Sequence, residues 1–432
     1  MKGLAMNMNE YKKRIADNII KKKLQGIGAV LIEGPKLCGK TTTAEQAAAS
    51  VLYMANSDER EQNLQLAKLK PSLLLQGETP RLIDEWQIAP EIWDAVRFEV
   101  DHRKEFGQFI LTGSAVPADR SKIFHSGTGR IAWVKMRTMS LYESGDSSGG
   151  ISLKQLFDGK EDLFDMNQKD DIEEIAYLSC RGGWPTALNV DKSIALDRAY
   201  DYYDAVVNID ISRVDGVNRE SERAKRLMRS YARFQGSQTS YEAMKEDIRA
   251  NDSENLTTNT IVSYVNALKK IFVIEDMPAW NPNIRSKSAI RTTDTRYFVD
   301  PSIAVAALGL GPYDLIRDLN TFGFIFEAMC IRDLRVYADA LEGTVYHYRD
   351  KSGLECDSVI HLRDGRYGLI EIKLGGDDNI EHGAKTLKKL KDTIDTDRMK
   401  EPSFMMVLVG KGKYAYRRDD GVYVVPITCL KD

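Results

Sequence analysis

The hydrophobic pattern of the first 115 residues alternates between two kinds of segment. Short apolar runs predict buried strands, and longer amphipathic or alanine-rich stretches predict helices. Strands that alternate with helices are typical of a parallel sheet, in which the ligand lies at the carboxyl ends of the strands. The predicted strands are 29–32, 72–75, 81–84 and 106–114, and the predicted helices are 10–25, 42–49 and 90–103.

A glycine-rich segment with the complete G-x-x-x-x-G-K-[ST] pattern joins the first of these strands to a helix. In such a loop the backbone N–H groups surround the phosphates of a nucleotide. Lys40 is expected to reach the β- and γ-phosphates, and Thr41 is expected to hold Mg²⁺. A chance glycine turn is the alternative, and the flanking strand and helix argue against it. The predicted ATP-contacting residues here are Gly34, Pro35, Lys36, Leu37, Cys38, Gly39, Lys40, Thr41 and Thr42.

Polar residues at the ends of two later strands complete the predicted nucleotide site. Asp84 ends a short apolar strand and is expected to bind Mg²⁺ through water, while Glu85 is expected to polarise the attacking water. Thr112 lies at the end of another apolar strand, where a hydroxyl group can sense the γ-phosphate. A solvated strand end is the alternative for the carboxylates, and a strand-terminating turn is an equally good local interpretation of Thr112.

Composition excludes several classes of protein. The net charge of −3 over 432 residues gives no general attraction to nucleic acid, so such a contact requires a local patch. The five cysteines have no C-x-x-C spacing, which argues against a zinc site and a disulfide framework. No apolar stretch approaches the ~20 residues of a membrane helix, and the N-terminus has no apolar leader core. A cytoplasmic protein without membrane contact is expected.

Several motifs occur in the order found in one family: Arg14-x-x-Asp17, 34–41, Ile83-Asp84-Glu85-Trp86-Gln87, Leu111-Thr112-Gly113-Ser114, Ser126-Gly127-Thr128-Gly129-Arg130 and 136–145. The chain resembles the AAA-type ATPases of bacteria and archaea, in which the ATPase module is joined to a C-terminal domain of uncharacterised function. The resemblance implies a role for Arg130 as the arginine that neutralises charge on the γ-phosphate, in cis or from a neighbouring subunit of a homo-oligomer. Arg137 competes for that role, and either arginine could instead cap a turn.

A turn-rich break at 146–150 precedes a region with mainly helical patterns. Residues 171–235 are expected to be helical, and 240–300 to contain helices followed by strands near 272–274 and 296–300. Helices followed by a hairpin are typical of a winged helix, an assignment that the family resemblance supports. Basic residues nearby make DNA contact a hypothesis, and a protein-contact or spacer module is the alternative. These basic residues are Arg219, Arg223, Lys225, Arg226, Arg229 and Arg233.

Four residues near the C-terminus suggest a second site. Glu371 and Lys373 are two apart on a predicted strand and therefore share a face, while Asp357 lies on the preceding strand of a predicted hairpin. With Glu327 on a helix, this set resembles the restriction-endonuclease-like (PD-(D/E)xK) fold. The resemblance implies Mg²⁺ or Mn²⁺ on Glu327, Asp357 and Glu371, with Lys373 orienting water. An exposed salt-bridged hairpin and an inactive nuclease fold are the alternatives.

The expected fold class is α/β, with a P-loop NTPase parallel sheet, a helical and winged-helix-like region, and a small endonuclease-like domain. The expected boundaries are 1–165, 166–300 and 301–432. The expected function is Mg²⁺-dependent ATP hydrolysis that controls a nuclease-like or nucleic-acid-contacting module, with DNA, a partner protein or further copies as partners. The alternative is an ATP-dependent switch or scaffold whose C-terminal domain is catalytically inactive.

Overall fold

The computed structural model describes residues 11–115, 125–161, 163–252, 256–282, 293–395 and 399–432. Contacts between residues divide them into two units. The first unit holds residues 11–33, 39–113 and 125–135, and the second holds the remaining described residues. Within these described ranges, no helix has the length and apolar character needed to cross a bilayer.

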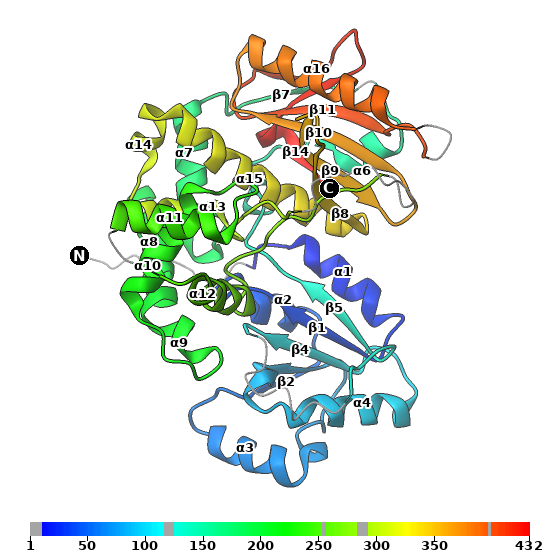
Figure 1. Ribbon diagram of the computed structural model, residues 1–432. Helices are drawn as coiled ribbons and strands as arrows, with labels where there is room; N and C mark the ends of the chain where they lie inside the picture. Colours follow the sequence, from blue (N-terminus) through cyan, green and yellow to red (C-terminus); the bar gives the residue numbers. More distant parts are fainter. Residues whose placement is uncertain (1–10, 116–124, 162, 253–255, 283–292, 396–398) are drawn as a thin grey trace, which may run out of the picture. The chain divides into compact units, whose positions relative to one another are not determined.

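The first unit is built on a five-stranded parallel sheet in the order β2-β3-β4-β1-β5 (Figure 1). Every strand pair in it is parallel, so the carboxyl ends of all five strands lie at one edge. The strands are β1 (Ala29–Glu33), β2 (Ser50–Tyr53), β3 (Arg81–Asp84), β4 (Phe109–Gly113) and β5 (Ile131–Lys135); the helices are α1 (Ile15–Leu24), α2 (Lys40–Glu45), α3 (Arg60–Leu69) and α4 (Glu91–Arg103), with short 3₁₀ turns at Pro71–Leu73 and Trp86–Ile88.

The core of this unit contains apolar residues from the strands and from α4. Leu31, Ile83 and Leu111 come from three neighbouring strands and are fully buried. Trp86 and Trp93 pack at 5.0 Å between ring centroids beside them. This packing fixes the strands beneath the edge that carries the polar residues.

Two expectations for the first unit were wrong. Residues 72–75 form no strand, because Pro71 begins a 3₁₀ turn that runs to Leu73, and Leu74 and Leu75 are then buried against the core. The helix expected over 42–49 ends at Glu45, and the chain then forms β2, which pairs with β3. An apolar run shows that side chains are buried, but it does not show which backbone conformation buries them.

The second unit contains a seven-stranded mixed sheet in the order β7-β12-β13-β11-β10-β9-β8. Strand β10 is antiparallel to β9 and parallel to β11, and α16 packs on one face of the sheet. Two short segments from far upstream belong to this part of the fold, since β7 pairs with β12 and β6 pairs with β14. The strands are β6 (Ile151–Ser152), β7 (Asp165–Met166), β8 (Gly343–Arg349), β9 (Glu355–Leu362), β10 (Tyr367–Lys373), β11 (Phe404–Val409), β12 (Tyr414–Arg417), β13 (Tyr423–Pro426) and β14 (Leu430–Lys431).

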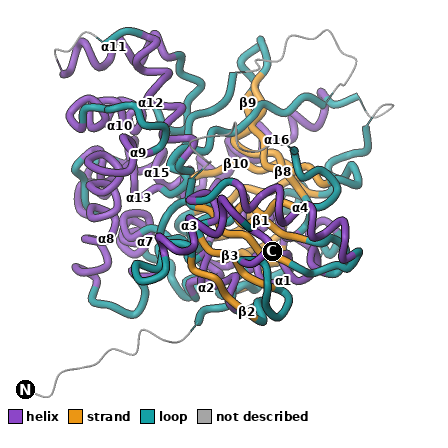
Figure 2. Tube along the Cα trace, turned by 90° about the horizontal axis from the view of Figure 1, so that it is seen from below, coloured by secondary structure: helices purple, strands orange, loops and turns teal. Residues whose placement is uncertain are grey.

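The remainder of the second unit is mainly helical, as expected for 171–235 (Figure 2). A π-helical turn, Val206–Asp210, continues α8 into α9. The helices are α5 (Leu141–Ser144), α6 (Leu153–Phe157), α7 (Ile172–Arg181), α8 (Lys192–Ala205), α9 (Ile211–Arg213), α10 (Ser221–Arg233), α11 (Tyr241–Asp252), α12 (Thr258–Lys270), α13 (Pro301–Leu308), α14 (Pro312–Arg317), α15 (Leu319–Ala340) and α16 (Asp377–Thr393), with 3₁₀ turns at Pro185–Ala187 and Ile427–Cys429.

The strands expected at 272–274 and 296–300 are present only as isolated antiparallel bridges. Ile274 pairs with Phe298, and Met277 pairs with Thr295. Two bridges do not form a continuous ladder, and residues 283–292, where the tip of a wing would lie, are outside the described residues. The winged helix therefore stays a prediction.

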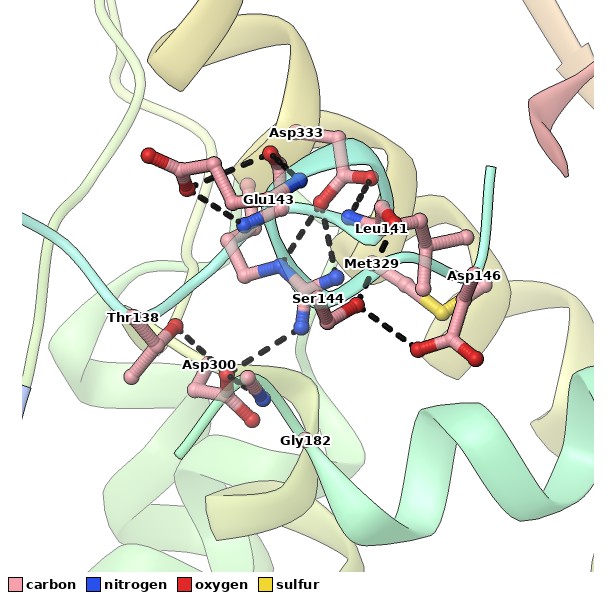
Figure 3. Close-up of polar contacts among 12 residues, drawn as sticks. Thr138, Leu141, Glu143, Ser144, Asp146, Gly182, Asp300, Met329 and Asp333 are labelled. Atoms are coloured by element: carbon pink, nitrogen blue, oxygen red, sulfur yellow. Dashed lines mark hydrogen bonds and ion pairs between the residues drawn. The ribbon is translucent and has the colours of Figure 1, made fainter. Parts of the chain in front are cut away.

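Buried carboxylates hold the segment that follows β5 (Figure 3). Asp300 accepts a 2.6 Å hydrogen bond from the Thr138 hydroxyl, and Asp333 accepts a 2.9 Å bond from the Leu141 amide. Arg332 pairs with both carboxylates, and all three charged side chains are almost fully buried. Burial raises the pKa of Asp333 to about 6, although the charge of Arg332 acts in the opposite direction.

Candidate functional site

The glycine-rich loop leaves β1 and enters α2 through two positions that require glycine. A Cβ on Gly34 would lie 1.9 Å from the Met136 carbonyl oxygen, so no side chain fits there. Gly39, the N-cap of α2, has a φ of 94°, which favours glycine. Leu37 also has a positive φ, 61°, and its side chain is 60% exposed. Among the other predicted loop residues, Pro35, Cys38 and Lys40 are buried, and Lys36 and Thr42 are exposed.

Three predicted residues meet at the carboxyl edge of the parallel sheet. Asp84 Oδ1 accepts hydrogen bonds of 2.6 Å from the hydroxyl groups of both Thr41 and Thr112. Thr41 belongs to α2, Asp84 ends β3, and Thr112 lies near the end of β4. Thr112 is completely buried and also accepts a hydrogen bond from the Glu85 amide at 3.3 Å.

The oxygen atoms of this group fit Mg²⁺. Mg²⁺ prefers hard oxygen ligands and keeps several of its waters. The Thr41 hydroxyl and the Asp84 carboxylate are already in contact, so both can face one hydrated ion. Lys40, the first residue of α2, is only 6% exposed, and its ammonium group is of the kind that can bind phosphate groups. When bound, Mg²⁺ would neutralise charge on the terminal phosphates.

Glu85 directly follows this group and has a strained backbone. Its φ of 57° and ψ of 45° place it in the left-handed region, which is uncommon for a residue other than glycine. Its carboxylate accepts a hydrogen bond from the Gln87 side-chain amide. Such conformations often occur at functional positions. The sequence pattern gave Gln87 no role, because its contact depends on the 3₁₀ turn at Trp86–Ile88.

The first half of the loop belongs to the second unit. Lys36 Nζ lies 2.5 Å from Asp210 Oδ1, and the Asp210 side chain is only 10% exposed. Cys38 Sγ lies 3.7 Å from the Met136 carbonyl oxygen. Asp210 ends the π-helical turn, a class of distortion that is frequent at functional sites. Sequence reasoning missed Asp210, which is 174 residues from its partner.

The two candidate arginines differ in their surroundings. Arg130 is 46% exposed and pairs with Asp101 on α4 at 2.8 Å. Its guanidinium holds the pKa of the Asp101 carboxyl below its usual value. Arg137 is buried between Glu275 and Asp339, at 2.7 and 2.5 Å. Arg137 therefore has a structural role in these pairs, and Arg130 is the arginine that solvent and a second molecule can reach.

The C-terminal sheet brings together the residues of the second predicted site. Lys373 Nζ lies 3.1 Å from Asp357 Oδ2 and 2.8 Å from Glu371 Oε2. Asp357 also accepts a hydrogen bond from the Ile372 amide at 2.8 Å. Glu327, on α15, accepts a hydrogen bond from the Tyr297 hydroxyl. Tyr297 was missed, because its position follows from bridges that the sequence does not specify.

The charges in this cluster are strongly coupled. Burial and the charge of Asp357 raise the pKa values of both Glu327 and Glu371 well above the usual range of a glutamate. Burial would lower the pKa of Lys373, but the charges of Asp357 and Glu371 outweigh it and raise that pKa. The cluster therefore strongly retains the ammonium proton and disfavours full ionisation of its glutamates.

The metal site expected from these carboxylates is not supported by this arrangement. Among the residues that the structure describes, no group of three or more His, Cys, Asp or Glu side chains could hold a metal ion. The Lys373 ammonium contacts both Asp357 and Glu371 and compensates part of their negative charge. Nuclease activity at this cluster, with Lys373 orienting water, therefore stays a prediction.

Several basic residues of the helical region are engaged within the chain. Arg219 is buried and pairs with Asp215 at 2.7 Å, and Arg233 pairs with Asp247 at 2.6 Å. Lys225 lies 2.9 Å from Glu222 on the same helix. These pairs weaken the case for the DNA contact that the sequence suggested for the winged-helix-like region. The remaining residues of that set, Arg223, Arg226 and Arg229, lie in α10, and Arg223 pairs with Glu220 at 3.3 Å.

Comparisons with known families divide the chain into three segments. Residues 27–144 match the family described as an AAA domain. Residues 172–314 match a domain of unknown function (DUF8612), and residues 322–430 match another domain of unknown function (DUF4143). The first match coincides with the parallel sheet and the Thr41–Asp84–Thr112 group. It supports ATP binding and hydrolysis by this segment.

Comparisons with individual proteins add little beyond this. None of the curated proteins matches the chain. Among solved structures, a Walker-type ATPase of Pyrococcus abyssi is similar with a TM-score of 0.40 and 14% identity. The match covers 69% of this chain and 96% of that one.

Proposed function

We propose that this protein is a Mg²⁺-dependent ATPase whose nucleotide cycle controls a nucleic-acid-contacting module in its C-terminal part. The observation that carries the ATPase assignment is the double hydrogen bond of Asp84 to Thr41 and Thr112 beside the buried Lys40. In this proposal Asp84 and Thr41 hold Mg²⁺, Lys40 binds the terminal phosphates, and Glu85 polarises water. Nuclease chemistry is not included, because the C-terminal carboxylates are bridged by Lys373.

Residues 34–38 of the phosphate loop belong to the second unit, which supports coupling between nucleotide binding and that unit. Lys36 and Cys38, which belong to the phosphate loop, contact Asp210 and Met136 in that unit. A ligand that reshapes the loop must therefore change contacts that end in the helical region. An ATP-dependent switch whose C-terminal domain only binds a protein is the competing function.

The ATPase assignment is tested by the variant Lys40→Ala. Removing the ammonium should abolish Mg²⁺-ATP binding in calorimetry and phosphate release in a turnover assay. Lys104→Ala, an exposed lysine at the end of α4, is the matched control and should behave like the unchanged protein. Unaltered turnover in Lys40→Ala would refute the ATPase site.

Nucleic-acid contact is tested separately by titrating the full chain with DNA at several salt concentrations, with and without a non-hydrolysable ATP analogue. Affinity that falls with salt and changes with the analogue supports the proposal, since neutralised phosphates release counterions. Absence of DNA binding, with ATP turnover intact, would favour the protein-binding switch.

A further inference from the structure

An unusual group of large side chains is exposed at the edge of the C-terminal sheet. Phe164 and Tyr414 stack with their ring centroids 5.8 Å apart and an interplanar angle of 25°. They are 63% and 45% exposed, and the neighbouring Met166 and Tyr416 are 60% and 38% exposed. Contiguous exposed apolar side chains commonly mark an interaction site. We call these four residues the aromatic ledge.

The strand register places the aromatic ledge at the same level of the sheet as Lys373. Lys373 pairs with Val409 on β11, and Val409 pairs with Pro426 on β13. Since β12 is antiparallel to β13 with Tyr416 opposite Val424, Tyr414 lies beside Pro426. Lys373 and Tyr414 therefore share one face and are separated by three strand spacings, roughly 14 Å at about 4.8 Å each.

A short loop with two exposed lysines connects these points. Lys411 and Lys413 lie between β11 and β12 and are exposed. The loop begins next to Lys373, because the Gly410 amide donates to the Lys373 carbonyl at 3.1 Å and the Lys411 amide donates to the Leu374 carbonyl at 2.9 Å. The loop ends at Tyr414, where the aromatic ledge begins.

The backbone of this loop is also held from its other side. Asn167 donates its side-chain amide to the Gly412 carbonyl at 2.8 Å and its backbone amide to the Lys413 carbonyl at 2.9 Å. The Gly412 amide donates to Asp170 at 2.9 Å. With its backbone groups engaged on both sides, the loop is preorganised and presents its lysine side chains to solvent.

We propose that the aromatic ledge and the lysines of this loop bind single-stranded nucleic acid and lead it toward the Lys373 cluster. Unpaired bases stack on exposed aromatic rings, whereas bases in a duplex are hidden in the helix. The two lysines supply cations for the intervening phosphates. This inference rests on the nucleic-acid contact that is part of the proposed function, and it names the strand type and the surface.

Acidic groups around the loop reduce the contribution of Lys411 and Lys413 to the affinity for nucleic acid. Asp170 is engaged by the Gly412 amide, and Asp377 and Asp378 begin α16 near Lys411. These carboxylates limit the positive potential, so stacking carries a large part of the affinity. The two lysines can contact two phosphates, which predicts a shallow salt dependence of binding. For a single strand, the logarithm of the binding constant should fall with the logarithm of the salt concentration with a slope of about −1.4.

The test compares a labelled oligothymidylate with a duplex of equal length, using fluorescence anisotropy and the full chain. Phe164→Ala/Tyr414→Ala should weaken single-strand binding about fivefold or more and leave the salt slope unchanged. Lys411→Ala/Lys413→Ala should weaken binding and bring the slope close to zero. Tyr313→Ala, which removes a 69% exposed ring on α14, is the control and should bind like the unchanged protein.

The outcomes separate this inference from the proposed function. Single-strand binding that persists unchanged in both double variants would overturn the inference, even if DNA binding and ATP turnover support the proposed function. Binding to duplex as tight as to single strand, with no effect of the aromatic changes, would also overturn it. Self-association of the full chain that the aromatic changes abolish would assign the ledge to a second copy instead. Melting temperatures and ATP turnover of the variants, both expected to be unchanged, exclude a folding defect as the cause of weakened binding.

Discussion

The hydroxyl of Thr41 lies 2.6 Å from Asp84 Oδ1. This hydrogen bond joins the start of α2 to the end of β3. Thr112 makes a second contact of the same length with the same oxygen atom. The Asp84 carboxylate is therefore oriented from two sides. Because preorganised ligands lose less entropy on binding, this pair is where Mg²⁺ affinity should be most sensitive to substitution.

The first prediction concerns Mg²⁺. Thr112→Val keeps the shape of the side chain but removes a hydroxyl group that orients Asp84. Loss of such a supporting contact typically costs 10–100-fold in metal affinity, so ATP binding should require about 10-fold or more Mg²⁺. Calorimetry over a Mg²⁺ series measures this, with Ser57→Ala, an exposed residue, as control. An unchanged Mg²⁺ requirement would contradict the predicted role of the contact.

The second prediction separates hydrolysis from binding. Glu85→Gln should retain ATP and slow turnover by about 10²-fold or more, the usual size of a general-base contribution. Gln87→Ala, which removes the amide bonded to Glu85, should give a smaller loss. Glu78→Gln alters an exposed glutamate and serves as the control. Equal loss of ATP binding and turnover in Glu85→Gln would make that residue structural.

The third prediction concerns Arg130. Arg130→Ala should leave ATP bound and reduce turnover by at least about 10-fold, because an arginine that stabilises the transition state contributes 10³-fold or more where it is fully engaged. Arg97→Ala, which removes the other arginine paired with Asp101, is the matched control. Mixing Arg130→Ala with Glu85→Gln protein should restore part of the turnover if the arginine acts on a neighbouring subunit. Unchanged turnover in Arg130→Ala alone would exclude the arginine from catalysis.

The fourth prediction concerns Lys373, which compensates Asp357 and Glu371. On a Lys40→Ala background, the unchanged cluster should give no Mn²⁺ binding heat. Lys373→Met should destabilise the fold by roughly 3 kcal/mol, since it leaves buried carboxylates unpaired, and should create a Mn²⁺ site. Lys388→Met, at the more exposed pair with Asp420, should do neither. If the protein with Lys373 intact binds Mn²⁺ and Glu371→Ala abolishes that binding, the carboxylates bind metal despite the lysine.

The fifth prediction concerns pH. The folded-state pKa of Asp333 is raised to about 6, so its contribution to stability is fully present below the unfolded pKa of about 3.9 and is lost as pH rises through 6. Asp333→Asn keeps a hydrogen-bond acceptor for the Leu141 amide and cannot ionise. The unfolding free energy of the unchanged protein minus that of the variant should therefore fall by at most about 3 kcal/mol between pH 4 and pH 7. Urea unfolding across this range measures it, and a difference that rises with pH would contradict the assignment.

The sequence by itself determined the chemistry of the nucleotide site. The spacing from Gly34 to Thr41 and the Asp84-Glu85 pair are local patterns, and each follows an apolar strand whose burial forces its polar end to the edge of the sheet. The pairing of Glu371 with Lys373 was also predictable, because residues two apart on a strand share a face.

Only the tertiary structure decided how charges from distant segments compensate each other. Lys36 meets Asp210 across 174 residues of sequence, and Lys373 lies between the carboxylates of Asp357 and Glu371. The leucines at 74–75 are buried without forming a strand, and β7 joins a sheet whose other strands begin at residue 343. Local patterns specify which residues are buried and which are polar, but the partner of each buried charge depends on long-range packing, which no local spacing encodes.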